Sequence, residues 1–334
     1  MSHVRSIGTG AGALAVLAVG LAALGTGGGA VSGGQEKETG MTSGAKPGEG
    51  IEVLDDAFKA VLAPNAAVRK VADGFQFTEG PVWIADAKCL LFSDIPADTI
   101  VRWEAGKGAS VFRKPSHNSN GNTVDREGRL VTCEHGSRTV TRTGKDGQVV
   151  TLASTYQGKR LNSPNDVVVK RDGTIWFTDP PYGIDPKTRE QEANRVYRLD
   201  PDAKEPVALV ADLDRPNGLC FSPDEKYLYV ANSDGKPENI RRYRVTADNR
   251  LEGGEVFATI RPGVPDGMRV DKDGRLYSTA GDGVHVFGTD GKLLGKFRVP
   301  ETPANCAFGG ADGRTLFMTA HTGLYAVDLA VGAP

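Results

Sequence analysis

Six polar residues recur along the 334-residue chain, each seven positions ahead of an acidic residue in or beside a turn. These leading residues are Glu79, Asn120, Asn165, Asn217, Asp266 and Asn305, and their acidic partners are Asp86, Glu127, Asp172, Asp224, Asp273 and Asp312. Carboxylates can take protons, and carboxylates and amides together offer oxygen atoms to a substrate or a cation. The leading residues are separated by 41, 45, 52, 49 and 39 positions, a period that indicates a repeat architecture.

The repeat unit is a β-hairpin followed by further short strands. Residues 165–179 show it best, with V-V-V, then the turn K-R-D-G, then I-W-F-T-D. An Asp-Gly pair between two β-rich runs is a strong hairpin signal, because the turn needs positive φ. Each unit therefore reads as a four-stranded antiparallel meander of propeller-blade size. Helical periodicity is almost absent from 66–329, which excludes an α-solenoid.

The two ends of the repeat region predict how the ring closes. The last unit has room for only about three strands before Leu329. Residues 67–72, just ahead of the first unit, are a candidate fourth strand that would remove an exposed edge. The predicted fold is an all-β, closed six-bladed β-propeller of four-stranded antiparallel blades.

The leading residues should converge at one mouth of the central channel. The residues 14 to 16 positions later lie at the same end of each hairpin: Asp94, Glu134 with His135, Asp179, Asn232, Gly281 and His321. Convergent polar groups in a concave site are the default active-site hypothesis. For any single position the alternative is an Asx side chain that caps a turn. The acids at the seventh position are expected to be structural turn residues.

Several stretches carry a family resemblance. They are F-T-E-G-P-V-W (77–83), H-N-S-N-G-N-T (117–123), G-K-R-L-N-S-P-N-D-V-V-V (158–169), I-W-F-T-D-P-P-Y-G (175–183), P-N-G-L-C-F-S-P-D (216–224) and P-D-G-M-R-V-D (265–271). These stretches occur in the family's order, and each falls at the same phase of the repeat. The chain therefore resembles the gluconolactonase/senescence-marker-protein (regucalcin)-like family of six-bladed propeller hydrolases. The resemblance spans roughly 51–329.

The resemblance implies a site with one divalent metal ion. By position, the metal ligands would be Glu79, Asn165, Asn217 and Asp266. This all-oxygen set favours Ca²⁺, with Mg²⁺, Zn²⁺ and Mn²⁺ as alternatives. The family's general base corresponds to Asp266, while a metal-activated water or Glu134 are alternatives, because a metal-bound carboxylate is a poor base.

Substrate contacts are expected from the same resemblance and from the second polar ring. Asn120 would hold sugar hydroxyls, and the further candidates are Glu134, His135, Asp179, Asn232 and His321. One departure stands out: the regucalcin branch has an Arg two residues before the residue that matches Asn165, and this chain has Ser163 there. The identity of the lactone therefore does not transfer from that branch.

Other chemistries find less support in the sequence. No G-x-S-x-G motif is present, so a nucleophile elbow is not expected. The formal net charge is −2, and no basic stripe or aromatic platform predicts nucleic-acid binding. The four Cys are far apart and each lies in a β-rich run, so buried thiols are expected, although an exported protein could pair two of them.

The N-terminal region predicts export. Residues 11–24 are an apolar run of signal-peptide length, so 1–30 is interpreted as a signal peptide, with an uncleaved membrane anchor as the alternative. Residues 31–50 resemble a flexible Gly/Ser linker, and 51–330 the propeller, with a short amphipathic helix over 51–63. The expected location is periplasmic or secreted.

The sequence thus predicts an exported, metal-dependent hydrolase of a small sugar lactone, with no nucleic-acid partner and no membrane contact beyond the N-terminal anchor. The oligomeric state is left open. An esterase or phosphotriesterase using the same site is one alternative. A non-catalytic propeller that binds a ligand is another.

Overall fold

The computed structural model describes residues 45–334. The predicted signal peptide and most of the predicted linker lie outside these residues. The last six residues assigned to the linker, 45–50, include a turn, in which the Gly48 backbone N–H donates to the Ala66 carbonyl at 2.9 Å. Within 45–334, no helix has the length and apolar character needed to cross a membrane.

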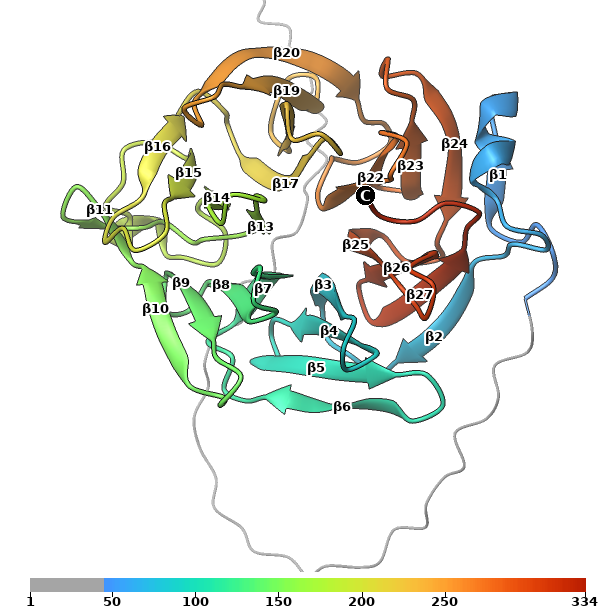
Figure 1. Ribbon diagram of the computed structural model, residues 1–334, viewed down its shortest axis with the longest axis horizontal. Coiled ribbons are helices and arrows are strands. Elements are labelled where there is room, and N and C mark those ends of the chain that lie inside the picture. Colours follow the sequence, from blue (N-terminus) through green and yellow to red (C-terminus); the bar gives the residue numbers. More distant parts are fainter. Residues whose placement is uncertain (1–44) are drawn as a thin grey trace, which may run out of the picture. The chain divides into compact units, whose positions relative to one another are not determined.

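Within residues 45–334, six antiparallel sheets stand around a central axis, and the strand that carries or follows each leading residue is innermost (Figure 1). Five of these sheets have four strands, and blade five has a fifth strand. Blade one comprises β3 (Thr78–Ile84), β4 (Cys89–Asp94), β5 (Thr99–Glu104) and β6 (Gly108–Arg113). Blade two comprises β7 (Ser119–Val124), β8 (Leu130–Glu134), β9 (Thr139–Thr143) and β10 (Val149–Ala153). Blade three comprises β13 (Val167–Val169), β14 (Ile175–Asp179), β15 (Arg195–Leu199) and β16 (Val207–Val210). The predicted six-bladed propeller is confirmed.

The other three blades repeat this order. Blade four comprises β17 (Pro216–Phe221), β18 (Tyr227–Asn232), β19 (Asn239–Val245) and β20 (Leu251–Thr259). Blade five has β21 (Met268–Val270), β22 (Leu276–Ala280), β23 (Gly283–Phe287) and β24 (Leu293–Arg298). Blade six has β25 (Pro303–Gly309), β26 (Thr315–Ala320) and β27 (Gly323–Asp328) from the C-terminal region. A small hairpin, β11 (Thr155–Tyr156) and β12 (Lys159–Arg160), lies between blades two and three, and η2 (Pro186–Thr188) lies in the β14–β15 loop.

The ring closes through β2 (Arg69–Asp73), which pairs antiparallel with β27 as the outer strand of blade six. Arg69 faces Ala326 and Asp73 faces Gly323 in this register. The outer edge of β27 is therefore covered by a strand from the other end of the repeat region, as the predicted closure requires.

The predicted amphipathic helix over 51–63 is not an α-helix. Its first residues form β1 (Ile51–Val53), which pairs with β24 as a fifth strand of blade five. A 3₁₀ helix, η1 (Asp56–Val61), follows, with the Asp55 carboxylate accepting from the Ala57 N–H at 2.9 Å. The open edge of blade five offers backbone partners that an isolated short helix lacks, so strand pairing prevails.

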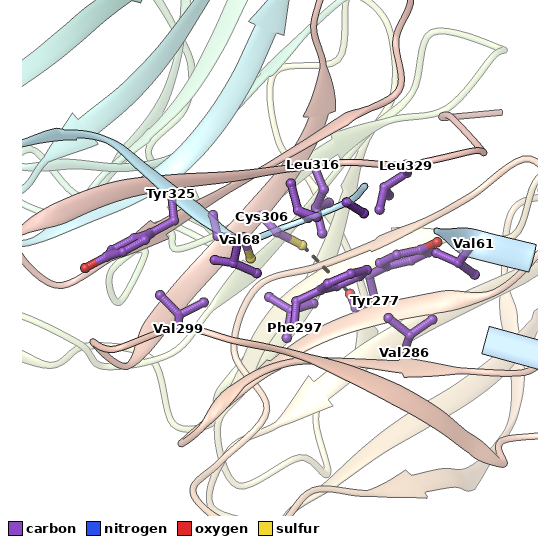
Figure 2. Close-up of a cluster of buried hydrophobic side chains, with 14 of the residues drawn as sticks. Val61, Val68, Tyr277, Val286, Phe297, Val299, Cys306, Leu316, Tyr325 and Leu329 are labelled. Carbon is purple, nitrogen blue, oxygen red and sulfur yellow. Dashed lines mark hydrogen bonds between the residues drawn. The ribbon is translucent and has the colours of Figure 1, made fainter. Parts of the chain in front are cut away.

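Apolar clusters between neighbouring blades hold the ring together. The largest joins η1 to blades five and six and includes Val61 of η1, Phe297 and Tyr277 of blade five and Leu316 of blade six (Figure 2). Between blades six and one, the Trp83 ring stacks on Phe317 with centroids 5.7 Å apart. All four Cys are buried free thiols, as expected. Burial of these faces fixes the blades at one angle and so fixes the channel they enclose.

Candidate active site

Irregular backbone at the start of the inner strands presents the leading residues to the channel. The ladders of blades one, two, four and six shift register at this point, between Glu79 and Val82 in blade one and between Pro216 and Leu219 in blade four. In blades three and five the inner strand begins two residues after the leading residue. Such irregularities re-aim side chains, and here they occur at the predicted site.

A glycine follows four of the six leading residues, and the packing explains why. A Cβ on Gly218 would lie 2.2 Å from the Asp266 carbonyl oxygen, and one on Gly80 would lie 2.0 Å from the Asn120 carbonyl oxygen. Only glycine allows one blade's leading segment to approach the next this closely. The repeated E-G, N-G and D-G pairs therefore draw the leading residues into one compact group.

Three asparagines form a continuous hydrogen-bonded arc across blades two, three and four. The Asn120 Nδ2 donates to Asn165 Oδ1 at 2.8 Å, and the Asn165 Nδ2 donates to Asn217 Oδ1 at 2.6 Å. All three side chains are buried. The Asn217 side chain lies close enough to the Asp266 carboxylate to lower its pKa. The structure thus joins three of the predicted metal ligands to the predicted sugar-binding residue.

The two carboxylates of the predicted ligand set lie close enough to repel each other. Burial, with the nearby Asp166 carboxylate, raises the pKa of Glu79 to about 7. Burial, followed by the charges of Glu79 and Asp166, raises the pKa of Asp266 well above its ordinary value. Glu79 Oε2 accepts hydrogen bonds from the Gly80 backbone N–H at 2.6 Å and from Asn305 Nδ2 at 3.0 Å. Asn305, which had no predicted role, therefore orients Glu79.

Two residues of the channel were missed at the sequence level. Asp166 is buried, with one oxygen held by the Val167 N–H at 2.9 Å and its Oδ2 without a hydrogen-bond partner. The nearest cation is Arg269, whose Nη1 lies 3.8 Å from that Oδ2. A signal was present in the sequence: Asn165 is followed by Asp where four other leading residues are followed by Gly.

Most of the second polar ring serves the backbone rather than the channel. Asp179 accepts from the Asn162 and Ser163 N–H groups at 2.8 and 2.7 Å, and burial raises its pKa to about 7. Asp94 and Asn232 cap the equivalent loops of blades one and four, accepting from the backbone N–H groups of Phe77 and Arg215 at 3.0 and 3.2 Å. The Asp179 carboxylate therefore binds the loop that immediately precedes Asn165.

Glu134 is also turned away from the asparagine arc. Its Oε1 accepts from Arg113 at 2.9 Å and from Thr141 at 2.8 Å, and its Oε2 accepts from Ser137 at 2.7 Å. The side chain is buried between blades one and two. Both oxygens are occupied, so the structure does not bring this candidate base to the site.

The two predicted histidines occupy different places. His135 Nε2 lies 3.1 Å from Asn165 Oδ1 and 3.3 Å from Asn120 Nδ2, so His135 joins the asparagine arc. Burial lowers its pKa to about 4, which keeps the ring neutral at pH 7. His321 is exposed and its ring packs edge-on against Phe77, with centroids 5.6 Å apart. It lies at the same end of the ring but outside the arc.

Comparison with known proteins agrees with this geometry. Residues 77–322 match the model of the SMP-30/Gluconolactonase/LRE-like region, which covers all six blades of the ring in whole or in part. The chain belongs to this family. A gluconolactonase from Zymomonas mobilis is 36% identical over 289 residues, covering 78% of this chain and 81% of that protein.

Two solved structures share the propeller fold of this chain. A gluconolactonase from Xanthomonas campestris is 38% identical with a TM-score of 0.80, covering 87% of this chain and 99% of that one. A calcium-binding regucalcin from Agrobacterium tumefaciens shares the fold at 20% identity and a TM-score of 0.66, covering 85% of this chain and 95% of that one.

The donor set of this family member fits a hard divalent cation. Within 45–334, no three His, Cys, Asp or Glu side chains gather into a metal-binding group, so a cation here would depend on the amides as well. Glu79 and Asp266 repel each other, and Asp166 Oδ2 is buried without a hydrogen-bond donor. A buried cluster of like charges needs a compensating charge, and amide and carboxylate oxygens suit Ca²⁺ or Mg²⁺.

Proposed function

We propose that the protein hydrolyses a sugar lactone at this channel mouth, in the manner of a gluconolactonase. The observation that carries the proposal is the joining of Asn120, Asn165 and Asn217 to two repelling carboxylates in a chain 36% identical to a gluconolactonase. Polar groups that converge in a concave site, with strongly shifted pKa values, are typical of catalytic centres.

The chain's own residues divide the work of ester hydrolysis. Asp266 is partly exposed, and its ionised carboxylate can act as the general base. It takes the proton of the attacking water as the oxygen bonds to the lactone carbonyl carbon. The ring C–O bond then breaks, and the proton passes to the leaving oxygen to give the hydroxy acid. Asn120 and neutral His135 offer hydrogen bonds to substrate hydroxyls.

We further propose that Glu79, Asn165, Asn217 and Asp266 hold one divalent metal ion, with Ca²⁺ favoured. The all-oxygen donor set supports this, as does the calcium-binding regucalcin that shares the fold. When bound, such an ion supplies Lewis acidity to the lactone carbonyl and neutralises the two carboxylates. Without the ion, protons would neutralise these carboxylates in part, as their raised pKa values indicate.

A substrate panel tests the proposal and separates it from its rivals. Purified protein with Ca²⁺ is expected to hydrolyse glucono-δ-lactone well above the spontaneous rate, followed by acid release in a pH-stat. An aryl ester and a phosphotriester in the same panel report the alternative esterase and phosphotriesterase activities. Activity on those compounds alone would replace the lactone assignment, and no activity on any of them would favour a binding protein.

Export is a proposal that rests on the N-terminal sequence alone. The apolar run at 11–24 supports a periplasmic or secreted location. The mass of the mature protein recovered from the culture medium or periplasm tests it. A full-length chain confined to the cytoplasm would contradict it.

A further inference from the structure

A second group of side chains lies at the same mouth, beside Asp266, and takes no part in the proposed chemistry. It consists of Tyr182 from the β14–β15 loop, Arg215 just before β17, and Ser233 with Asp234 just after β18. These four residues are called the rim cluster. It draws on blades three and four and touches the segment that begins blade five.

Contacts within the rim cluster hold it against the catalytic centre. The Arg215 guanidinium lies 5.6 Å from the centroid of the Tyr182 ring, and its Nε lies 3.3 Å from Asp234 Oδ2. Ser233 Oγ donates to the Pro265 carbonyl at 2.7 Å, and Pro265 is the residue before Asp266. The Ser233 N–H donates to the Arg215 carbonyl at 3.1 Å, which ties the two loops together.

Tyr182 connects this cluster to Asp266. Its phenol lies near both Asp266 and Ser233. A phenol hydroxyl can donate a hydrogen bond at neutral pH. The side chain is only half-buried, so one part of it faces solvent at the mouth.

Arg215 is distinct among the residues at its register. The positions two residues before the leading residues carry Phe77, Asn118, Ser163, Arg215, Val264 and Pro303. Arg215 is the one charged side chain in this set. A guanidinium at this register lies at the entrance to the channel, and its Asp234 partner supplies an acceptor next to its donors.

The Arg215–Asp234 pair is open to ligands. The two side chains are 44% and 57% exposed, and exposed ion pairs contribute little to folding stability. A polyol can replace water around such a pair, because a hydroxyl donates to a carboxylate and accepts from a guanidinium at once. An unsubstituted lactone ring has no hydroxyl to offer, and its ester group is needed at Asp266.

We propose that Tyr182, Arg215 and Asp234 form a subsite for the hydroxyl groups of the lactone, which selects polyhydroxy lactones over unsubstituted ones. This inference rests on the proposed lactone hydrolysis and adds the residues that read the substrate's polyol part. Ser233 positions the subsite through Pro265 and is not itself a substrate contact.

Kinetics of Arg215→Gln and Tyr182→Phe test the subsite. Each variant is expected to raise the KM for glucono-δ-lactone about tenfold, with kcat within about twofold of wild type, because one hydrogen bond to a charged or phenolic donor is lost. The KM for δ-valerolactone, or its inhibition constant if it is not hydrolysed, should stay unchanged. Arg250→Gln is the matched control: Arg250 also pairs with an exposed Asp, Asp248, but at the opposite end of blade four.

The outcomes separate the two proposals. If the wild-type protein hydrolyses neither lactone, lactone hydrolysis itself is refuted and the subsite falls with it. If the wild type hydrolyses glucono-δ-lactone but both rim variants keep its KM, the subsite is wrong while the activity stands. Equal effects on both lactones would also overturn the subsite. Melting temperatures exclude misfolding, and Arg215→Lys serves in place of Arg215→Gln if that variant does not fold.

Discussion

At the residue scale, side chains of the same type and phase divide into those that face the channel and those that hold the backbone. Asn165 contributes both amide atoms to the asparagine arc, whereas Asp179, at the end of the second strand of the same hairpin, accepts from two backbone N–H groups. The sequence predicted both as polar residues of one mouth. It could not separate them, because the choice depends on which loop packs nearest, a tertiary contact.

The same limit explains why His135 joined the arc and Glu134 did not. Glu134 is the last residue of β8, whereas His135 already belongs to the following turn, so the two side chains take different directions. Sequence phase alone placed both at the mouth, one residue apart. Asp166 and Arg269 were missed because their importance arises from proximity across the channel, with their charged atoms 3.8 Å apart.

The glycine after Asn217 gives a prediction at this scale. Gly218→Ala places a methyl group 2.2 Å from the Asp266 carbonyl oxygen, so blade five must shift away from blade four. We expect lactone kcat/KM to fall at least tenfold while the fold is retained, because catalysis depends on sub-ångström placement. Gly106→Ala is the control: its φ of +78° makes alanine strained, but nothing lies within 4 Å of the added methyl. Unaltered activity in Gly218→Ala would count against the close approach of the two leading segments.

At the element scale, repeat phase predicted the strands well because each blade is a local meander. It predicted β2 as the closing strand because the last blade lacked a partner. The predicted helix over 51–63 is present only as the 3₁₀ helix at 56–61. Residues 51–53 pair instead with β24 at the edge of blade five, which local periodicity cannot reveal. A segment of mixed apolar spacing adopts whichever structure the neighbouring edge supports.

Glu301 links the closing strand to blade six and yields a pH prediction. Burial alone would raise its pKa, but hydrogen bonds from Thr322 and Tyr325, with Lys70 nearby, lower it to about 2. A carboxylate with a lowered pKa stabilises the fold above its unfolded-state pKa, here about 4.5, and that stability is lost as the pH falls towards 2.

Glu301→Gln should therefore lower the free energy of unfolding by about 1–2 kcal/mol at pH 7, as measured by urea denaturation. The difference from wild type should shrink between about pH 4.5 and pH 2, because wild-type Glu301 becomes protonated there. Glu255→Gln, on the outer strand of blade four, is the control for an exposed ion pair. A difference that stays constant from pH 7 to pH 2 would exclude the ionised carboxylate as the source of stability.

At the scale of the whole molecule, one ring of six blades both buries the core and gathers the site, so ligand binding and global stability are coupled. Any ion that binds the folded ring and not the unfolded chain stabilises the ring by mass action. Removing Ca²⁺ with a chelator is expected to lower the melting temperature, and Ca²⁺ at about one hundred times its Kd should restore about 2.7 kcal/mol. Calorimetry of the wild type and of Glu79→Gln checks this. The Glu79→Gln variant should melt at the same temperature with and without Ca²⁺. A full calcium shift in Glu79→Gln would place the ion elsewhere.

The central claim is that lactone hydrolysis occurs at Asp266 in the channel, and one comparison along a single hairpin tests it. Asp266 and Asp273 lie at opposite ends of the β21 segment, with Asp273 in the turn beside Arg275 and Lys272. We predict that Asp266→Asn reduces the pH-stat rate on glucono-δ-lactone to the level seen with EDTA, at least a hundredfold below wild type, while Asp273→Asn keeps the wild-type rate. Equal activity of Asp266→Asn and wild type would contradict the account.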